Sequence, residues 1–279
     1  MNKIGILHPG EMGVSIAASA MNSGHSVYWV STNRSEQTRL RAEKNNLIEL
    51  KSLAEICETC EVIISVCPPH AAEEVARSVV MEKFKGIYLD ANAISPQRVN
   101  RLQQIMEENG IQFIDGSIIG GPAWKAGETC LYLSGKEAEV IRDCFQNGPL
   151  ETKIIGNEAG KASAIKMCYA AYSKGTTALL ASILAAAEVL GVREDLGRQW
   201  DMDDPGFSDQ VNRRVMRTTD KAWRFTGEME EIAATFEQAG LPGGFHQAAA
   251  EVFRRMANME PDEQDRLMQI LTTIRHRKP

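Results

Sequence analysis

The 279-residue sequence predicts an α/β protein, in which a doubly wound parallel sheet is followed by an all-helical region. Two observations lead to this prediction. Up to about residue 155, short runs of β-branched and aromatic residues alternate with helical segments, whereas no convincing strand follows the turn Gly156–Gly160. The length is close to that of two average domains. We therefore expect a first domain over residues 1–158 and a helical substrate or dimerisation domain over residues 159–279.

The first domain is predicted element by element. Its strands are expected at Ile4–Leu7, Ser26–Val30, Val62–Val66, Ile87–Leu89 and Gln112–Ile114. Its helices are expected at Met12–Met21, Ser35–Lys44, Ala71–Val80 and Pro96–Glu108. A further strand, helix and strand, Thr129–Ser134, Glu137–Phe145 and Thr152–Ile155, would extend the sheet on one side. This alternation is typical of βαβ units.

The second domain is predicted to be entirely helical. Lys161–Leu190 is one Ala- and Leu-rich segment and predicts a single long central helix. Further helices are expected at Lys221–Gln238, Phe245–Met256 and Glu263–Ile274, separated by Gly- and Pro-containing turns. The long helix has too many apolar side chains for all of them to be exposed to solvent. They are Leu179, Leu180, Ile183, Leu184 and Leu190. We expect other helices to cover part of it and a second subunit to cover the rest.

Composition excludes several classes of protein. The formal net charge of −6 disfavours binding of nucleic acid or of an anionic membrane. Six cysteines are too few for a disulfide framework, and the lone Cys57-x-x-Cys60 pair has no second pair at metal-ligand spacing. The longest uncharged apolar run lies between Lys174 and Glu188, too short to span a bilayer. These features predict a soluble cytoplasmic protein without a metal site.

A glycine-containing turn follows the first predicted strand. His8-Pro9-Gly10-Glu11-Met12-Gly13 leads directly into a helix, as the G-x-G-x-x-G fingerprint of a dinucleotide site does. Gly10 and Gly13 fill the second and third glycine positions, and His8 replaces the first. The retained glycines are those that admit the pyrophosphate and pack the helix on its strand. The turn therefore predicts a Rossmann-like domain that binds a dinucleotide.

The end of the second strand indicates which dinucleotide is bound. An NAD site usually has Asp or Glu there, to hold the ribose 2′-hydroxyl. This sequence instead continues Ser31-Thr32-Asn33-Arg34-Ser35, in which hydroxyls and a guanidinium can bind a 2′-phosphate. In the other interpretation Ser35 caps the next helix and Arg34 is solvated. We expect NADP, with Ser31, Asn33, Arg34 and Ser35 as contacts.

Two more strand ends should face the same crevice. Cys67-Pro68-Pro69 follows one strand, and Asp90 to Pro96, which includes Asn92, follows the next. In open α/β sheets, ligands bind outside the carboxyl ends of the strands. We therefore expect the Cys67–Pro69 segment at the cofactor and Asn92 at the substrate.

At these residues the chain resembles the β-hydroxyacid dehydrogenase and 6-phosphogluconate dehydrogenase superfamily, which also includes imine reductases. The family segment D-x-S-[ST]-x-S-P is matched from Asp90 to Pro96, with Asn92 in place of a substrate-binding Ser. The segment D-A-P-V-S-G-G is matched from Asp115 to Gly121 and keeps its glycine pair. The residues in these motifs resemble those of one branch of the family, in which the helical domain is described as uncharacterised.

The same resemblance identifies a candidate catalytic lysine. The family stretch G-x-x-x-K-x-x-N is matched from Ala162 to Tyr169, which keeps Lys166 and has Tyr169 in place of Asn. On one continuous helix, Tyr169, Ser173 and Thr177 would lie about −60°, −20° and +20° from Lys166. Such a polar stripe requires a ligand, a partner or a solvated face. The sequence of this segment does not decide among these three possibilities, and the family resemblance favours a catalytic role for Lys166.

The resemblance implies an oxidoreductase that moves a hydride between nicotinamide and a small polar alcohol or carbonyl compound. Lys166 would be the general acid/base, and Tyr169 or Ser173 would orient it or relay the proton. Asn92 and the backbone amides around Gly120 and Gly121 would hold the polar end of the substrate. The family also implies a homodimer formed through the helical domain.

Two alternatives stay open. One is an imine reductase in which Tyr169 supplies the proton, and the other is a non-catalytic NADPH-binding sensor or scaffold. Glu228, Glu231 and His246 are weaker candidates for the mouth of the active site. For them, a solvated helix face and a helix cap are the favoured interpretation. The Pro122–Gly127 loop would either close over the substrate or pack between the domains.

Overall fold

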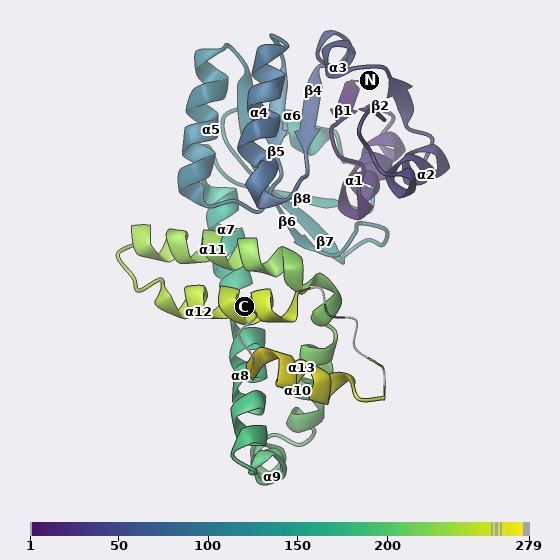
Figure 1. Ribbon diagram of the computed structural model, residues 1–279. Coiled ribbons are helices and arrows are strands. Elements are labelled where there is room, and N and C mark those ends of the chain that lie inside the picture. The colour runs from purple at the N-terminus through teal and green to yellow at the C-terminus, as the bar shows by residue number, and fades with distance from the viewer. Residues whose placement is uncertain (1, 258, 260–261, 263, 276–279) are drawn as a thin grey trace. The chain divides into compact units, whose positions relative to one another are not determined.

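The structure is a computed structural model that describes residues 2–257, 259, 262 and 264–275 (Figure 1). The chain forms two compact units, which divide between Lys166 and Met167, inside one helix. Each unit is described by itself.

An eight-stranded sheet is the frame of the first unit. Its strands are β1 (Lys3–Ile6), β2 (Ser26–Val30), β3 (Ile48–Leu50), β4 (Val62–Ser65), β5 (Ile87–Asp90), β6 (Gln112–Gly120), β7 (Thr129–Ser134) and β8 (Glu151–Gly156). They lie in the order β3-β2-β1-β4-β5-β6-β7-β8, and every neighbouring pair is parallel except β6–β7. The order reverses between β1 and β4, so the ligand crevice of a doubly wound sheet is expected at their carboxyl ends.

Helices cover both faces of this sheet (Figure 1). They are α1 (Glu11–Asn22), α2 (Glu36–Lys44), α3 (Leu53–Thr59), η1 (Pro69–Ala71), α4 (Ala72–Met81), α5 (Pro96–Glu108) and α6 (Ala138–Asp143). One core packs α1, α2 and α6 against residues such as Ile4 and Ile64. The other packs α3, α4 and α5 against residues such as Ile63 and Tyr88. Because successive strand residues point to opposite faces, the apolar strands supply both cores.

The predicted doubly wound α/β fold is confirmed. Ser26–Val30, Thr129–Ser134 and Pro96–Glu108 have the predicted bounds, and the other predicted elements of this unit exist with shifted ends. β6 continues to Gly120 beyond the predicted end at Ile114, because it pairs with β7 along its second half. The sequence analysis missed β3 and α3.

The second unit, from Met167 onwards, contains only helical elements among its described residues. They are the end of α7 (Lys161–Ala170), the π-helical turn η2 (Ala171–Gly175), α8 (Thr176–Val189), α9 (Arg193–Asp203), α10 (Phe207–Met216), η3 (Thr219–Lys221), α11 (Ala222–Gln238), α12 (Gly244–Met256) and α13 (Arg266–Arg275). α11 and α12 lie side by side as a helical hairpin (Figure 1). The predicted start of the last helix, Glu263, lies outside the described residues.

The prediction of one continuous helix from Lys161 to Leu190 is wrong. The π-helical turn η2 separates α7 from α8. Its Ser173 carbonyl oxygen accepts hydrogen bonds from Arg214 Nη2 at 2.5 Å and from Thr177 Oγ1 at 2.8 Å. Because a π turn holds more residues than an α turn, positions after it leave the predicted stripe. Thr177 is buried and bound to Arg214 Nε rather than aligned with Lys166.

Among the described residues, no helix is both long and apolar enough to cross a bilayer.

Candidate active site

The turn between β1 and α1 has the shape that a dinucleotide requires. A Cβ atom on Gly13 would lie 2.1 Å from the His8 carbonyl oxygen, so only glycine lets α1 pack this closely on the strand. A Cβ atom on Gly10 would meet no atom within 4 Å, so the backbone there faces open space. Gly10 is also the N-cap of α1, where unpaired amides favour an anion.

The other residues of this turn have distinct surroundings. Burial, and then the nearby Arg34, lower the pKa of His8 to about 4, so its ring is neutral near pH 7. Its Nδ1 is buried and has no hydrogen-bond partner among the described residues. Pro9 is buried and Met12 packs on the core, whereas Glu11 points outward to Arg41 at 3.7 Å. Glu11 therefore does not fill the space in front of Gly10.

Several polar side chains at the end of β2, which the sequence predicts to bind the cofactor, already form hydrogen bonds with other protein groups. Ser31 Oγ donates to the carboxylate of Glu49, which comes from β3. Arg34 Nη2 donates to the Leu7 carbonyl oxygen at 3.1 Å, while Arg34 Nε is buried without a partner among the described residues. Asn33 is exposed in the left-handed region with φ of 60°. Ser35 caps α2, because its Oγ accepts from the Thr38 amide at 3.3 Å.

These observations test whether a dinucleotide fits. Three features lie at the carboxyl end of β1. Only glycine fits at Gly13, and the backbone at Gly10 faces open space. His8 Nδ1 and Arg34 Nε are buried without a hydrogen-bond partner among the described residues. Polar atoms that are buried without a partner are rare and need a ligand, an ion or water. The residues present therefore fit a bound dinucleotide.

Asn92 joins the ends of β4 and β5. Its side chain is only 2% exposed. Nδ2 donates to Asp90 Oδ2 at 2.8 Å and to Ser65 Oγ at 3.2 Å, and Oδ1 accepts from the Cys67 amide at 2.6 Å. These bonds hold the loop after β4 against the end of β5. The contacts support a positioning role for Asn92, and its contact with substrate stays a prediction.

The loop after β4 is itself tightly held. Burial raises the pKa of the Cys67 thiol to about 12, so it is not a thiolate near pH 7. Pro68 caps the short helix η1, and the Pro69 carbonyl oxygen accepts from Arg98 Nη2 at 2.9 Å. Burial also raises the pKa of Asp90 to about 7. The predicted segment Cys67–Pro69 thus lies at the carboxyl edge of the sheet in a fixed conformation.

Lys166 reaches the same edge from α7. Its Nζ donates to the Ile118 carbonyl oxygen on β6 at 2.7 Å. Two residues further along, Gly120 has φ of 127°, and a Cβ atom there would lie 2.3 Å from the Glu128 carbonyl oxygen. Gly121 faces open space. The amine of Lys166 therefore lies near the carboxyl end of β6, close in the chain to the glycine pair.

A buried carboxylate fixes the start of the helix that carries Lys166. Asp115 Oδ2 accepts from the amides of Gly160 at 2.8 Å and Ser163 at 3.0 Å, and Oδ1 accepts from Ser163 Oγ at 2.7 Å. Ser134 Oγ donates to Asp115 at 2.9 Å and accepts from the Ala162 amide at 3.0 Å. Asp115 and Ser134 thus satisfy amides that a helix start leaves unpaired. β6 holds α7 at two points, Asp115 and Ile118.

Tyr169 and Ser173 belong to the second unit. Tyr169 is 51% exposed, so its phenol is accessible. The backbone of Ser173 is committed to the π turn, as described above. Their roles beside Lys166 stay predictions.

The favoured interpretation of Glu228, Glu231 and His246 as a solvated face and a helix cap is wrong. They are 7%, 9% and 5% exposed, respectively. Glu228 forms an ion pair with Lys174 of the π turn, and Lys174 Nζ lies 4.6 Å from the ring centroid of Phe225. His246 packs edge-on against Phe236, with ring centroids 4.3 Å apart. Buried charges persist where they are paired, so this cluster is part of the interior of the helical unit.

The Pro122–Gly127 loop packs against α1. The amide of the buried Ala123 donates to Ser15 Oγ at 2.9 Å. Pro122 and Trp124 then line a cavity of about 480 Å³ together with Glu11, Val14, Arg41, Lys44 and Asn45. This cavity adjoins the first turn of α1, on the side of α2.

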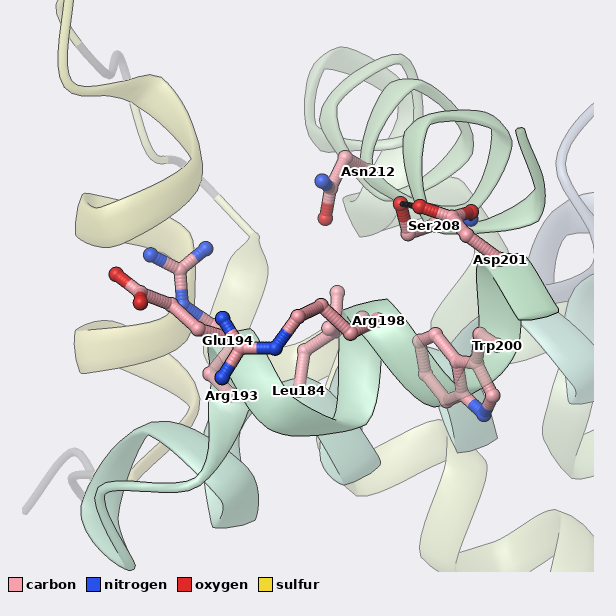
Figure 2. Close-up of a pocket in the computed structure, with 9 residues that line it drawn as sticks. Leu184, Arg193, Glu194, Arg198, Trp200, Asp201, Ser208 and Asn212 are labelled. Atoms are coloured by element: carbon pink, nitrogen blue, oxygen red, sulfur yellow. Dashed lines mark hydrogen bonds between the residues drawn. The ribbon is translucent and has the colours of Figure 1, made fainter. Parts of the chain in front are cut away.

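The helical unit has a cavity of about 320 Å³ between α8, α9 and α10 (Figure 2). Two arginines line it, but Arg193 pairs with Glu188 at 2.5 Å and Arg198 pairs with Asp195. Asp201 Oδ2 accepts from Ser208 Oγ at 2.7 Å. Each of these two arginines therefore has a carboxylate partner in the helical unit.

Comparison with known proteins identifies the family. Residues 3–146, more than half of the chain, match the family described as the NAD binding domain of 6-phosphogluconate dehydrogenase. The chain belongs to this family. Residues 187–256 match a domain of unknown function, DUF1932. The family resemblance predicted from the motifs is thus confirmed, and the DUF1932 match lies in the helical region that follows the NAD binding domain.

Two relatives of this chain are proteins without an assigned activity. An uncharacterized 28.5 kDa protein of Methanothermus fervidus is 31% identical over 164 residues, which are 58% of this chain and 62% of that protein. The match thus spans less than two thirds of that relative. The conserved protein MTH1747, described as structurally similar to 3-hydroxyacid dehydrogenases, is 26% identical with a TM-score of 0.65, covering 98% of this chain and 96% of its own.

Two solved enzymes share the fold at lower identity. The 3-hydroxyisobutyrate dehydrogenase of Mycobacterium tuberculosis is 16% identical with a TM-score of 0.72, covering 99% of this chain and 100% of its own. An imine reductase of Myxococcus stipitatus, solved with NAD⁺, is 15% identical with a TM-score of 0.60, covering 97% and 99%.

Glu49 and Asp115 are the residues whose contacts the sequence analysis missed. Glu49 contacts Ser31 from 18 positions away, and Asp115 contacts Ser163 from 48 positions away. The local sequence gave one signal, which was Asp115 as the first residue of the Asp115–Gly121 segment. The family resemblance matched this residue but assigned no function to it.

Proposed function

We propose that the protein is an NADP-dependent oxidoreductase that moves a hydride between nicotinamide and a small polar alcohol or carbonyl compound. One observation carries the proposal. Lys166 Nζ is anchored at the Ile118 carbonyl oxygen, near the sheet edge where Gly10 faces open space. Ligands of doubly wound sheets bind at this edge. An amine fixed there can act on a substrate beside the cofactor.

The bound nicotinamide would accept or supply the hydride at its C4 atom. The chain supplies the proton chemistry. In the oxidation direction, the Lys166 amine takes the proton of the substrate hydroxyl as the hydride leaves the carbinol carbon, and in reduction it returns that proton to the oxygen. The amides near Gly120 and Gly121 hold the polar end of the substrate. Asn92 keeps the loop at Cys67 in place through its own bonds.

The preference for NADP rests on Arg34. Its Nε is buried and has no hydrogen-bond partner in the described part of the chain, and its guanidinium lies at the end of β1, beside His8. A planar guanidinium is well suited to a phosphate. β2 and the turn that follows contain no Asp or Glu of their own at the position usual for an NAD site.

Turnover of a Lys166→Ala variant tests the proposal. A positioned acid/base is worth 10²–10⁴-fold, so we expect the rate with a responding substrate to fall at least about 100-fold. The dissociation constant for NADPH should stay within about two-fold, because Lys166 contacts β6 rather than the glycine turn. The substrate is found by following nicotinamide absorbance with a panel of hydroxyacids, carbonyl compounds and cyclic imines. Unchanged turnover in Lys166→Ala would remove Lys166 from the mechanism.

A second candidate function is imine reduction with Tyr169 as proton donor. The exposed phenol of Tyr169, three positions after Lys166 on α7, favours it. A Tyr169→Phe variant distinguishes the two, since it should abolish turnover of an imine, whereas turnover of a hydroxyacid, for which Lys166 is retained as the acid/base, should fall much less. Tight NADPH binding without turnover of any compound would instead indicate a sensor or scaffold.

We also propose a homodimer formed through the helical unit. Leu179 and Leu190 of this unit are 43% and 73% exposed, whereas Leu180 and Leu184 are buried within it. Apolar side chains exposed along one helix are typical of a subunit contact.

A further inference from the structure

The acid that faces the end of β2 comes from the neighbouring strand. β2 and β3 are parallel, with Trp29 opposite Glu49 and Val30 opposite Leu50. Because side chains alternate along a strand, Glu49 lies on the same face of the sheet as Ser31. The Ser31 hydroxyl donates to its carboxylate. Register and contact therefore agree in bringing a negative charge to the position that reads the ribose in this fold.

Two cations surround the same point. Arg39 Nη2 donates to the Ser31 carbonyl oxygen at 3.3 Å, and Arg34 Nε has no acceptor among the residues that the structure describes. Arg34 and Arg39 attract a 2′-phosphate, whereas Glu49 repels it. A hydroxyl also has a single proton to donate. While Ser31 donates to Glu49, it cannot donate to a phosphate.

We propose that Glu49 is a specificity-determining residue that opposes the 2′-phosphate and narrows the preference for NADP over NAD. The 2′-hydroxyl of NAD can donate to this carboxylate, while the 2′-phosphate of NADP has to displace it from Ser31. Specificity of this kind depends on a repulsive element as much as on attractive contacts. The inference rests on the proposed function, because it requires the dinucleotide to bind at the glycine turn.

Titration with NADPH and NADH tests this role without any turnover. Binding is measured by calorimetry for wild type, Glu49→Gln and Arg34→Ala. In Glu49→Gln, we expect affinity for NADPH to rise about three- to five-fold relative to that for NADH, as removal of one exposed charge near a phosphate allows. Since Glu49 is exposed, the gain should shrink as salt is raised.

Matched variants separate the possible outcomes. Glu43→Gln removes the same charge from an exposed position in the last turn of α2, and it should leave the ratio of the two affinities unchanged within two-fold. Arg34→Ala should weaken NADPH more than NADH. An unchanged ratio in Glu49→Gln, or an equal change in Glu43→Gln, would overturn the role of Glu49 while the proposed function stands. If wild type bound neither nucleotide, the proposed function would fail and this inference with it.

Discussion

Asp90 is a carboxyl group whose environment disfavours its charge. It is fully buried at the end of β5, and burial raises its pKa from 3.8 to about 7. The folded chain thus binds this proton more tightly than the unfolded chain. The corresponding stability is complete below about pH 4 and is lost as the pH rises through about 7.

An Asp90→Asn variant should therefore gain stability relative to wild type as the pH rises. The expected change in relative free energy of unfolding between pH 5 and pH 8 is on the order of 2–3 kcal/mol, since one pKa unit corresponds to about 1.4 kcal/mol. Urea unfolding at the two pH values measures it.

The control for this prediction is Asp143→Asn. Asp143 is exposed, and its hydrogen bond from Arg142 lowers its pKa, so this variant should show no gain at high pH. If the free energy of unfolding of Asp90→Asn relative to wild type were the same at the two pH values, ionisation of the buried Asp90 carboxyl would cost little free energy, which would contradict the prediction.

At the scale of elements, the start of α7 depends on one carboxylate. Replacing Asp115 by Asn would leave buried amides of Gly160 or Ser163 without an acceptor, at about 1–3 kcal/mol for each. We expect Asp115→Asn to lower the free energy of unfolding by about 2–4 kcal/mol. Hydrogen exchange should quicken at residues 160–166 and change little in α1.

A milder variant checks that this effect arises at the helix start. Ser163→Ala removes only the Ser163 hydroxyl donor and keeps both backbone amides on Asp115. It should cost no more than about half as much as Asp115→Asn. Equal exchange in α1 and in α7 of Asp115→Asn would point to general loosening of the unit instead.

Local patterns were sufficient for most elements of the first unit. Ser26–Val30 and Thr129–Ser134 are strands with strong β-type composition, and Pro96 marks a helix start. Ile48–Leu50 escaped prediction because it is a three-residue edge strand, with Ile48 and Glu49 exposed. Its strand character depends on pairing with β2 rather than on its own composition.

The break in the long helix had only a weak local signal. Ala- and Leu-rich sequence on both sides favours a continuous α-helix, and Gly175, although a poor helix former, does not by itself indicate a π turn. The π turn instead has tertiary partners, since Arg214 binds the Ser173 carbonyl and Glu228 pairs with Lys174. The two partners lie 41 and 54 positions away in the chain. Helical spacing therefore could not align Lys166 with Thr177, and the catalytic role that the motif resemblance assigns to Lys166 stays a prediction.

At the scale of the whole molecule, association is the property to measure. Light scattering should give twice the mass of one chain at micromolar concentration. Leu179→Glu and Leu190→Glu should shift the protein toward the monomer, because each buries a charge in the proposed contact. Leu40→Glu is a matched control, as Leu40 is 55% exposed on α2 of the first unit. A wild-type protein that is monomeric throughout this range would contradict the dimer.

The register of β5 and β6 sets Asp90 directly opposite Asp115, both fully buried. Burial raises the pKa of Asp90 to about 7, and the charge of Asp115 adds to this shift. The formal count of −6 treats both as charged, and the folded chain near neutrality therefore carries a smaller negative charge than its composition implies. Denaturation releases the retained proton into the buffer, so the heat absorbed on melting depends on the ionisation enthalpy of that buffer.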